Sequence, residues 1–222
     1  MIINEIFYSL QGEGLLAGVP SVFVRLAGCP LRCAWCDTKY ALDPNAGDDL
    51  SISQIIDKVK QWQCQHVVIT GGEPMINPQL PELVVTLKKQ DKHITIETSG
   101  IKFVPDLPCD LMSISPKLSN SVEKTKNAPD PFFHIDATRQ LISNYPYQLK
   151  FVVDSPDDLA EIQLAIAQIG DVVPDKVLLM PQAKTREELI AKSPMVADLC
   201  KHAGFTFSNR LHILLWNNQR GV

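Results

Sequence analysis

Short apolar runs rich in β-branched residues recur along this chain, and stretches with helical spacing of apolar residues separate them. Near-continuous apolar runs such as HVVIT, which begins at His66, are typical of strands buried on both faces of a parallel sheet. The alternation of strand and helix therefore predicts parallel βαβ units and an α/β fold. The runs predicted as strands are residues 21–28, 66–72, 93–100, 111–117, 148–154 and 176–182.

Apolar residues at helical spacing predict helices at residues 51–62, 78–90, 155–169 and 185–202, with Pro194 a kink or break in the last. Only about ten residues separate the third and fourth strands, so no long crossover helix fits there. Residues 120–131 are polar and are predicted to form a loop. With 222 residues, the chain is expected to form a single domain, residues 1–222. The predicted fold is an incomplete, modified (β/α) TIM-like barrel of about six parallel strands.

The unusual residues of the sequence follow the predicted strands. A cysteine-rich loop follows the first strand, and TGGEP, ETSG, SPK and MPQ end the second, third, fourth and sixth. Functional residues in such folds gather at the carboxyl ends of the strands. We therefore expect five strand ends to converge on one face and to form the site there.

Composition limits the kinds of molecule that this face is expected to bind. The net charge of −4 argues against a nucleic-acid binder that relies on phosphate neutralisation. No apolar run approaches the length of a membrane span, and the opening MIINEIFYSLQGEG is not a signal peptide. We therefore expect a cytoplasmic protein that binds neither nucleic acid nor membrane.

The loop CPLRCAWC carries the strongest chemical signal, with Cys29, Cys33 and Cys36 within eight residues. In a reducing compartment, clustered cysteines indicate metal or redox chemistry rather than disulfides. Structural zinc is normally closed by four protein ligands, and no partner pair of ligands occurs elsewhere in the sequence. A [4Fe–4S] cluster held by three cysteines, with one iron left open, is the better interpretation. The isolated residues Cys64, Cys109 and Cys200 are expected to be buried free thiols.

These motifs resemble those of a known group of enzymes. The cysteine loop matches the signature of the radical S-adenosylmethionine superfamily, and GGEP at residues 71–74 is similar to its second motif. More narrowly, SLQGEG, GVPSVFVRLAGC, CAWCDT, VVITGGEP, IETSG, SISPK and RLHILLWNNQRGV resemble the 7-carboxy-7-deazaguanine synthase family. The resemblance covers roughly the first half of the chain and its C-terminal end, and residues 120–177 carry no motif of the family.

The resemblance implies a lyase reaction of queuosine and other 7-deazapurine biosynthesis. In that family, S-adenosylmethionine binds the open iron, and its reductive cleavage yields a 5′-deoxyadenosyl radical. The radical abstracts hydrogen from 6-carboxy-5,6,7,8-tetrahydropterin, which contracts to 7-carboxy-7-deazaguanine with loss of ammonia. The resemblance also implies Mg²⁺, an electron donor such as flavodoxin or ferredoxin, and a homodimer.

Site residues follow from the resemblance by position. It assigns Cys29, Cys33 and Cys36 to the cluster and Thr38 to Mg²⁺. It assigns no catalytic side chain beyond the cluster and S-adenosylmethionine. The residues implied to bind S-adenosylmethionine are Gly72, Ser115, Pro116, Lys117 and Gln182. Those implied to bind the pterin are Leu10, Gln11, Gly12, Arg25 and Thr70.

Other interpretations stay open where the residues alone are considered. Arg25 interrupts an apolar strand, which by itself favours a structural ion pair. Glu13 is a further substrate candidate, and the role of Glu97 is undecided between a hydrogen bond to cofactor and a turn cap. His212 and Trp216 are expected to pack.

Two rival functions share the cysteine signature. A radical-activating enzyme would place its radical on a partner protein, and a non-catalytic iron–sulfur or zinc module would perform no reaction. SLQGEG and the small size of the chain favour a small pterin substrate over a protein substrate.

Overall fold

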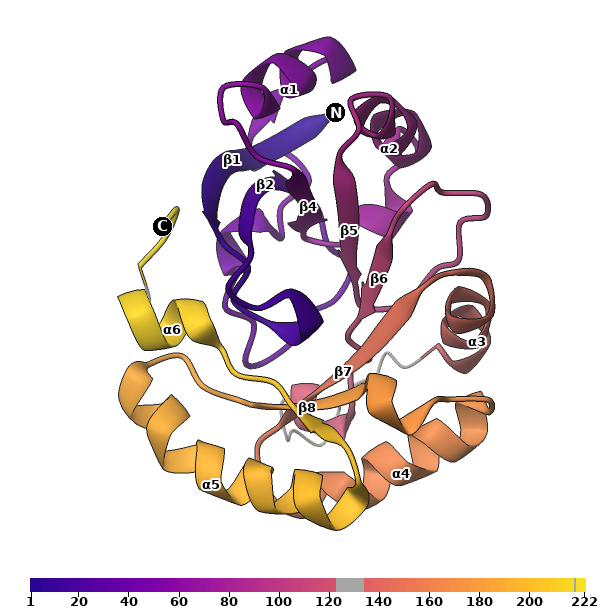
Figure 1. The fold of residues 1–222 in the computed structure, drawn as a ribbon, viewed down its shortest axis with the longest axis vertical. Helices are drawn as coiled ribbons and strands as arrows, with labels where there is room; N and C mark the ends of the chain where they lie inside the picture. The colour runs from indigo at the N-terminus through magenta and orange to yellow at the C-terminus, as the bar shows by residue number, and fades with distance from the viewer. Residues whose placement is uncertain (123–133, 218) are drawn as a thin grey trace.

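The computed structural model describes residues 1–122, 134–217 and 219–222. Its strands form a nine-stranded sheet in the order β3-β1-β2-β4-β5-β6-β7-β8-β9. The sheet curves, and the helices α2 to α5 lie along its outer side (Figure 1). Because the order is linear, the end strands do not pair with each other, and the barrel is incomplete as predicted. The strands are β1 (Ile2–Leu10), β2 (Pro20–Leu26), β3 (Asp48–Asp49), β4 (His66–Gly71), β5 (His93–Thr98), β6 (Leu111–Ile114), β7 (Tyr147–Val153), β8 (Val177–Pro181) and β9 (Thr206–Phe207).

The parallel part of the sheet runs from β2 to β9, with each strand parallel to its neighbour. All six predicted strands are confirmed, as β2, β4, β5, β6, β7 and β8. The sequence analysis missed β1, which pairs antiparallel with β2 and with the short β3. Most residues of β1 are only half-buried, so its sequence lacks the continuous apolar run by which the parallel strands were predicted.

The four predicted helices are confirmed as α1 (Ile52–Val59), α2 (Leu80–Lys88), α4 (Asp158–Ile169) and α5 (Arg186–Ala203). A capping box between Ser51 and Gln54 begins α1. The predicted break at Pro194 is wrong because α5 continues through it. Buried Leu189 before the proline and Val196 after it hold both halves of α5 against the protein. The helices α3 (Ile135–Asn144) and α6 (Leu211–Trp216) were not predicted.

The connection between β5 and β6 contains no helix, which confirms the prediction for that segment. A 3-10 turn at Ser119–Ser121 begins the predicted loop 120–131, and residues 123–131 of that loop lie outside the described residues. Within the described ranges, no helix is both long enough and apolar enough to cross a membrane.

Polar side chains cross the concave side of the sheet at one level. Arg25 of β2 is in register with Thr70 of β4, and Glu97 of β5 is in register with Ser113 of β6. Ser113 is in turn in register with Gln148 of β7. Since side chains of a strand alternate between its two faces, the apolar neighbours of these residues pack under the outer helices. The sheet therefore presents an apolar outer face to the helices and a polar inner face to the site.

Candidate active site

A cavity of about 530 Å³ lies over the inner face and the carboxyl ends of the parallel strands. It brings together residues that follow five strands, which confirms the predicted convergence. Pro116 is buried in the protein and does not line the cavity. The other predicted site residues all line it, namely Leu10, Gln11, Gly12, Arg25, Cys29, Cys33, Cys36, Thr38, Thr70, Gly72, Ser115, Lys117 and Gln182.

Glu97 is at the centre of a polar wall of the cavity, which it forms with Gln11 and Thr70. Its Oε1 accepts a hydrogen bond from Gln11 Nε2 at 3.0 Å, and its Oε2 accepts one from Thr70 Oγ1 at 2.8 Å. Gln11 and Thr70 are themselves buried, which fixes the orientation of the carboxylate. Each carboxylate oxygen can accept a further hydrogen bond, so Glu97 presents acceptors to the cavity.

Arg25 enters the cavity from β2 and is held by Glu5 of β1, with 2.7 Å between Arg25 Nε and Glu5 Oε1. Tyr40 donates a hydrogen bond to the same oxygen of Glu5 at 3.2 Å. Among the described residues, neither terminal nitrogen of Arg25 has a hydrogen-bond partner. The structural ion pair expected from the residues alone is therefore present, and it leaves the outer edge of the guanidinium free.

The C-terminal residues 219–222 also line the cavity. Arg220 Nε donates to Glu5 Oε2 at 2.9 Å, and its guanidinium lies 3.9 Å from the centre of the Tyr40 ring. Ser9 donates a hydrogen bond to the carbonyl of Val222. Burial alone would raise the pKa of Glu5, but the hydrogen bonds from Arg25 and Arg220 outweigh burial and lower it.

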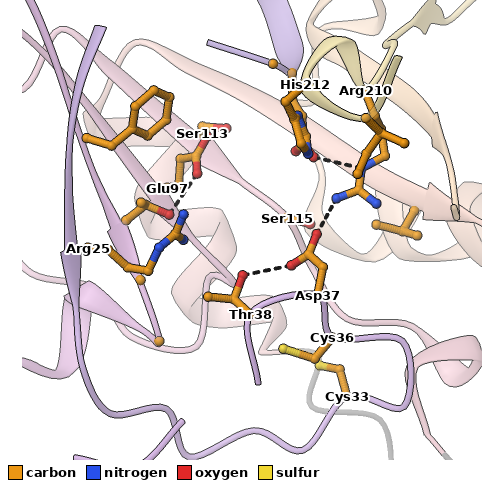
Figure 2. A pocket seen from close by; sticks show the side chains of 18 of the residues that line it. Arg25, Cys33, Cys36, Asp37, Thr38, Glu97, Ser113, Ser115, Arg210 and His212 are labelled. Carbon is orange, nitrogen blue, oxygen red and sulfur yellow. Dashed lines mark hydrogen bonds and ion pairs between the residues drawn. The ribbon is translucent and has the colours of Figure 1, made fainter. Parts of the chain in front are cut away.

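A network of charges forms the opposite wall, in which Glu13, Lys150 and Arg210 are largely buried and Asp37 is partly exposed. Glu13 accepts hydrogen bonds from Lys150 Nζ at 2.5 Å and from Arg210 Nε at 3.0 Å. Arg210 also donates to the carboxylate of Asp37, and Asp37 Oδ1 accepts from Thr38 Oγ1 at 2.8 Å. Figure 2 shows these links between Arg210, Asp37 and Thr38.

The pKa values of this network follow from its charges. Burial would raise the pKa of Glu13, but the positive charges of Lys150 and Arg210 outweigh burial and lower it well below 4.5. Burial likewise opposes ionisation of Asp37, and the charge of Arg210 lowers its pKa. Both carboxylates are therefore ionised at neutral pH.

The three cysteines line one end of the cavity, and Figure 2 shows Cys33 and Cys36 next to Asp37. Burial raises the pKa of Cys29 to about 11 and also raises the pKa values of Cys33 and Cys36. As thiolates they therefore require a positive metal centre, which displaces their protons. Within the described residues, no three Cys, His, Asp or Glu side chains converge on a point that would hold a single metal ion.

This arrangement fits a cluster better than a single ion. In a [4Fe–4S] cube each cysteine binds a different iron, so three sulfurs need not converge on one point. The three thiols come from one loop, are half-buried and line the same end of the cavity. They are the sulfur donors that such a cluster requires. The remaining cysteines, Cys64, Cys109 and Cys200, are buried free thiols, as predicted.

Two glycines at the end of β4, Gly71 and Gly72, bring the backbone close to β2 and the start of the cysteine loop. A Cβ on Gly72 would lie 2.0 Å from the carbonyl oxygen of Gly28, the residue before Cys29. Gly71 has φ +133°, and a Cβ there would lie 2.2 Å from the carbonyl oxygen of Leu26. The glycines are therefore required by close packing, whatever ligand the backbone faces.

Lys117 and Gln182 are held in place by neighbouring side chains. Lys117 Nζ donates to Ser115 Oγ at 2.9 Å and lies 5.4 Å from the centre of the Trp35 ring. Burial lowers the pKa of Lys117, an effect that the thiol of Cys33 opposes when it is ionised. Gln182 Oε1 accepts from Lys192 Nζ at 2.8 Å.

Several cavity residues were not singled out from the sequence. Lys150 interrupts an apolar strand as Arg25 does, and that signal could have identified it. His212 was expected to pack, and it lines the cavity against Gly12, whereas Trp216 does not line it. Asp37 and Arg210 lie in the motifs CAWCDT and RLHILLWNNQRGV, but nothing local indicated that they pair across most of the chain.

Known proteins resemble this chain over most of its length. A profile of the radical SAM superfamily matches residues 24–127. The 7-carboxy-7-deazaguanine synthase of Halobacterium salinarum is 40% identical over 97% of this chain and 90% of its own. The 7-carboxy-7-deazaguanine synthase of Pyrobaculum aerophilum is also 40% identical, over 99% of this chain and 96% of its own.

Solved structures also resemble this chain. The crystal structure of QueE from Escherichia coli has a TM-score of 0.74 and 27% identity, covering 95% of this chain and 94% of that one. SuiB of Streptococcus suis bound to its precursor peptide SuiA shares the fold with a TM-score of 0.59 at 13% identity, covering 84% of this chain and 47% of that one. The motifs, the cavity and the full-length relatives agree, and the chain belongs to the 7-carboxy-7-deazaguanine synthase family of the radical SAM superfamily.

Proposed function

We propose that this chain converts 6-carboxy-5,6,7,8-tetrahydropterin to 7-carboxy-7-deazaguanine with loss of ammonia, as a step of queuosine and other 7-deazapurine biosynthesis. One observation carries the proposal: a single cavity holds both the three-cysteine loop and a polar wall suited to a small, flat, anionic molecule. Its volume of about 530 Å³ is within the range of small-molecule sites. The hydrogen-bonding groups of Gln11, Thr70 and Glu97 suit a small polar molecule, which favours the pterin over the partner protein of a radical-activating enzyme.

Arg25 is proposed to bind the carboxylate of the pterin. Its Nε is occupied by Glu5, and its free edge faces the cavity. Guanidinium binds carboxylate through two parallel charge-assisted hydrogen bonds, which fixes orientation as well as affinity. Glu5 therefore orients Arg25 so that its two terminal nitrogens point towards the substrate.

Glu97, Gln11 and Thr70 are proposed to bind the opposite edge of the substrate. The amino-pyrimidinone edge of a pterin carries neighbouring N–H donors, and the carboxylate of Glu97 offers two oxygens to meet them. Hydrogen bonds from Gln11 and Thr70 hold those oxygens in place. Leu10 and Gly12 complete this part of the wall. The role of Glu97, which the sequence left undecided, is thereby proposed as substrate recognition.

Cys29, Cys33 and Cys36 are proposed to hold the [4Fe–4S] cluster. Gly72, Ser115, Lys117 and Gln182 are proposed to hold S-adenosylmethionine at the same end of the cavity. When bound, the cluster and S-adenosylmethionine supply the one-electron chemistry that begins the reaction. The protein orients S-adenosylmethionine and the pterin, covers the cavity and fixes the distance between these two ligands. Pro116 stays a prediction of the motif, since it does not line the cavity.

Thr38 is proposed to bind Mg²⁺ together with oxygens of the substrate and water. The Thr38 hydroxyl donates a hydrogen bond to Asp37, so the lone pairs of the Thr38 oxygen stay available to a cation. Omitting Mg²⁺ from an assay in chelator-treated buffer is expected to lower turnover, and adding it back restores turnover. Equal rates with and without Mg²⁺ would remove the ion from the proposal.

The remaining partners are proposed from the family. The chain is proposed to act as a cytoplasmic homodimer and to receive electrons from a flavodoxin or a ferredoxin. Sedimentation of the pure protein tests the homodimer, and a monomer across micromolar concentrations would contradict it. Replacing dithionite with either reduced protein tests the electron donor.

The proposed reaction is tested by incubating anaerobically reconstituted protein with the pterin, dithionite and S-adenosylmethionine, followed by mass analysis. The expected product has the mass of 7-carboxy-7-deazaguanine. Cleavage of S-adenosylmethionine with unchanged pterin would favour a radical-activating enzyme. A colourless protein that holds one zinc ion would favour the non-catalytic module.

A further inference from the structure

Arg210 connects three segments that lie far apart in the sequence. It is only 6% exposed and precedes α6. Its Nε donates to Glu13, its Nη1 to the carbonyl of Ala183 and its Nη2 to Asp37. Each of the three guanidinium nitrogens therefore contacts a different loop.

Two of these loops have distinct proposed tasks. Glu13 follows Gln11 and Gly12 in the loop 10–14, which is proposed to bind the pterin. Asp37 directly follows the cluster ligand Cys36. One side chain thus joins the substrate loop, residues 10–14, to the cluster loop, residues 29–38.

Backbone contacts fix the substrate loop to the segment that carries Arg210. Gly14 N donates to Ser208 Oγ at 2.9 Å, and Leu211 N donates to the Gly12 carbonyl at 2.8 Å. A Cβ on Gly12 would lie 2.0 Å from Nδ1 of His212. These contacts therefore tie the substrate loop to the segment 208–212, so that a displacement of one displaces the other.

The cluster loop has fewer attachments. Among the described residues, two backbone hydrogen bonds tie its second half to residues outside the loop: Ala34 N donates to the Ser121 carbonyl at 2.9 Å, and Ala41 N donates to the Thr38 carbonyl at 3.0 Å. Within the same residues, Asp37 has hydrogen bonds only from its neighbour Thr38 and from Arg210. Removing Arg210 therefore removes a principal restraint on the segment that follows Cys36.

We propose that Arg210 is a positioning residue that restrains the cluster loop and couples it to occupation of the substrate loop. The coupling rests on the proposed function, because it requires the pterin to bind loop 10–14. A guanidinium can hold two carboxylates at a fixed angle, whereas an ammonium behaves as a single point charge. Binding of the pterin makes loop 10–14 more rigid, and Arg210 transmits that rigidity to the cysteines.

The test measures the rate at which a strong iron chelator removes iron from the anaerobically reconstituted protein. Arg210→Met is expected to release iron about tenfold faster than wild type, because, of its three hydrogen bonds, the one to Asp37 restrains the cluster loop, and one hydrogen bond to a charged group contributes about that much. The variant is expected to fold, because Glu13 keeps Lys150 and the Asp37 side chain is 39% exposed to water. Arg139→Met is the matched control: Arg139 makes backbone and ion-pair contacts away from the cavity.

Further variants separate positioning from general loss of stability. Asp37→Asn is expected to match Arg210→Met, and the double variant is expected to release iron no faster than either single variant. Arg210→Lys, which is milder for folding, is expected to weaken the restraint as well, because an ammonium on a shorter, flexible side chain does not reproduce the fixed geometry of the guanidinium.

Adding 6-carboxy-5,6,7,8-tetrahydropterin is expected to slow iron release in wild type and to leave it unchanged in Arg210→Met. Wild-type iron release in Arg210→Met and Arg210→Lys would overturn the proposal, as would additive effects of Arg210→Met and Asp37→Asn. A pterin effect that persists in Arg210→Met would overturn the coupling. If wild type does not bind the pterin, the proposed function and the coupling fail together, whereas the restraint is still judged from iron release without pterin.

Discussion

Two arginines share one carboxylate at the rim of the cavity. Glu5 accepts from Arg25 at 2.7 Å and from Arg220 at 2.9 Å, so the three groups together carry one net positive charge. That charge matches a single carboxylate on the substrate. The arrangement explains how an arginine in an apolar strand can serve an ion pair and a ligand together.

The first prediction concerns Arg25→Lys. Lysine can pair with Glu5 but cannot also offer a bidentate fork, so we expect the KM for the pterin to rise about tenfold to a hundredfold. Affinity for S-adenosylmethionine is expected to stay near wild type. Both are measured by steady-state kinetics and by equilibrium binding. Arg139→Lys, on α3, is the control, and an equal loss of affinity for both ligands would indicate a purely structural Arg25.

The second prediction concerns pH. Because the pKa of Glu13 is lowered in the folded protein, its ion pairs contribute stability fully above its ordinary pKa of 4.5, and this contribution is lost as pH falls below that value. Breaking a buried ion pair costs about 3 kcal/mol, so Glu13→Gln is expected to lower the free energy of unfolding by about that amount at pH 7.

Denaturant unfolding of the cluster-free protein between pH 7 and pH 3 measures this difference. The gap between wild type and Glu13→Gln is expected to narrow as the solution becomes more acid than pH 4.5. Glu187→Gln, at an exposed carboxylate, serves as the control with a small effect. A gap that is constant with pH would show that the charge of Glu13 is not responsible.

At the scale of elements, the turn after β4 places the glycine pair against β2. Gly71 has φ +133°, and a Cβ there would lie 2.2 Å and 2.4 Å from the backbone oxygen and nitrogen of Leu26. Backbone atoms of a central strand cannot move aside cheaply. The position of the cysteine loop after β2 therefore depends on this close approach.

The third prediction compares Gly71→Ala with Gly204→Ala. Gly204 ends α5 with φ +71°, and a Cβ there would meet none of the described residues within 4 Å, so its replacement is expected to cost only about 1 kcal/mol of backbone strain. Gly71→Ala adds a clash with β2 and is expected to cost several times as much. Thermal unfolding of both variants measures the difference. Similar melting temperatures would show that the sheet can accommodate a Cβ at Gly71.

Elements that local patterns specify were predictable, and elements that depend on distant partners were not. The run HVVIT is apolar on both faces because β4 lies in the middle of the sheet, and so its strand was evident. The half-buried β1 owes its conformation to pairing with β2. Pro194 illustrates the opposite error, since packing on both sides of it outweighs a local helix-breaking signal.

The same distinction applies to the site. The cysteine motif is local, so its residues and their chemistry could be predicted from spacing. The link between Glu13 and Arg210 joins residues 197 positions apart, and only the folded sheet brings them together. Resemblance supplied the identity of the substrate residues, whereas the structure supplied the partners that orient them.

For the whole molecule, the open sheet explains how one cavity can serve the two proposed ligands. The carboxyl ends of the strands hold the cysteine loop, and the inner face holds the polar wall, so one cavity contains both. The C-terminal end lies beside β1 (Figure 1), where Ser9 donates a hydrogen bond to the Val222 carbonyl. The central claim is therefore that the three cysteines of this cavity hold the reactive centre.

The most direct test compares Cys33→Ala with Cys200→Ala after anaerobic reconstitution. Iron content and S-adenosylmethionine cleavage are measured, and circular dichroism reports whether each variant is folded. We expect a folded Cys33→Ala that does not cleave S-adenosylmethionine, because Cys33 lines the cavity, and a Cys200→Ala that cleaves it like wild type, because Cys200 is buried elsewhere. Cleavage at the wild-type rate by Cys33→Ala would contradict the account.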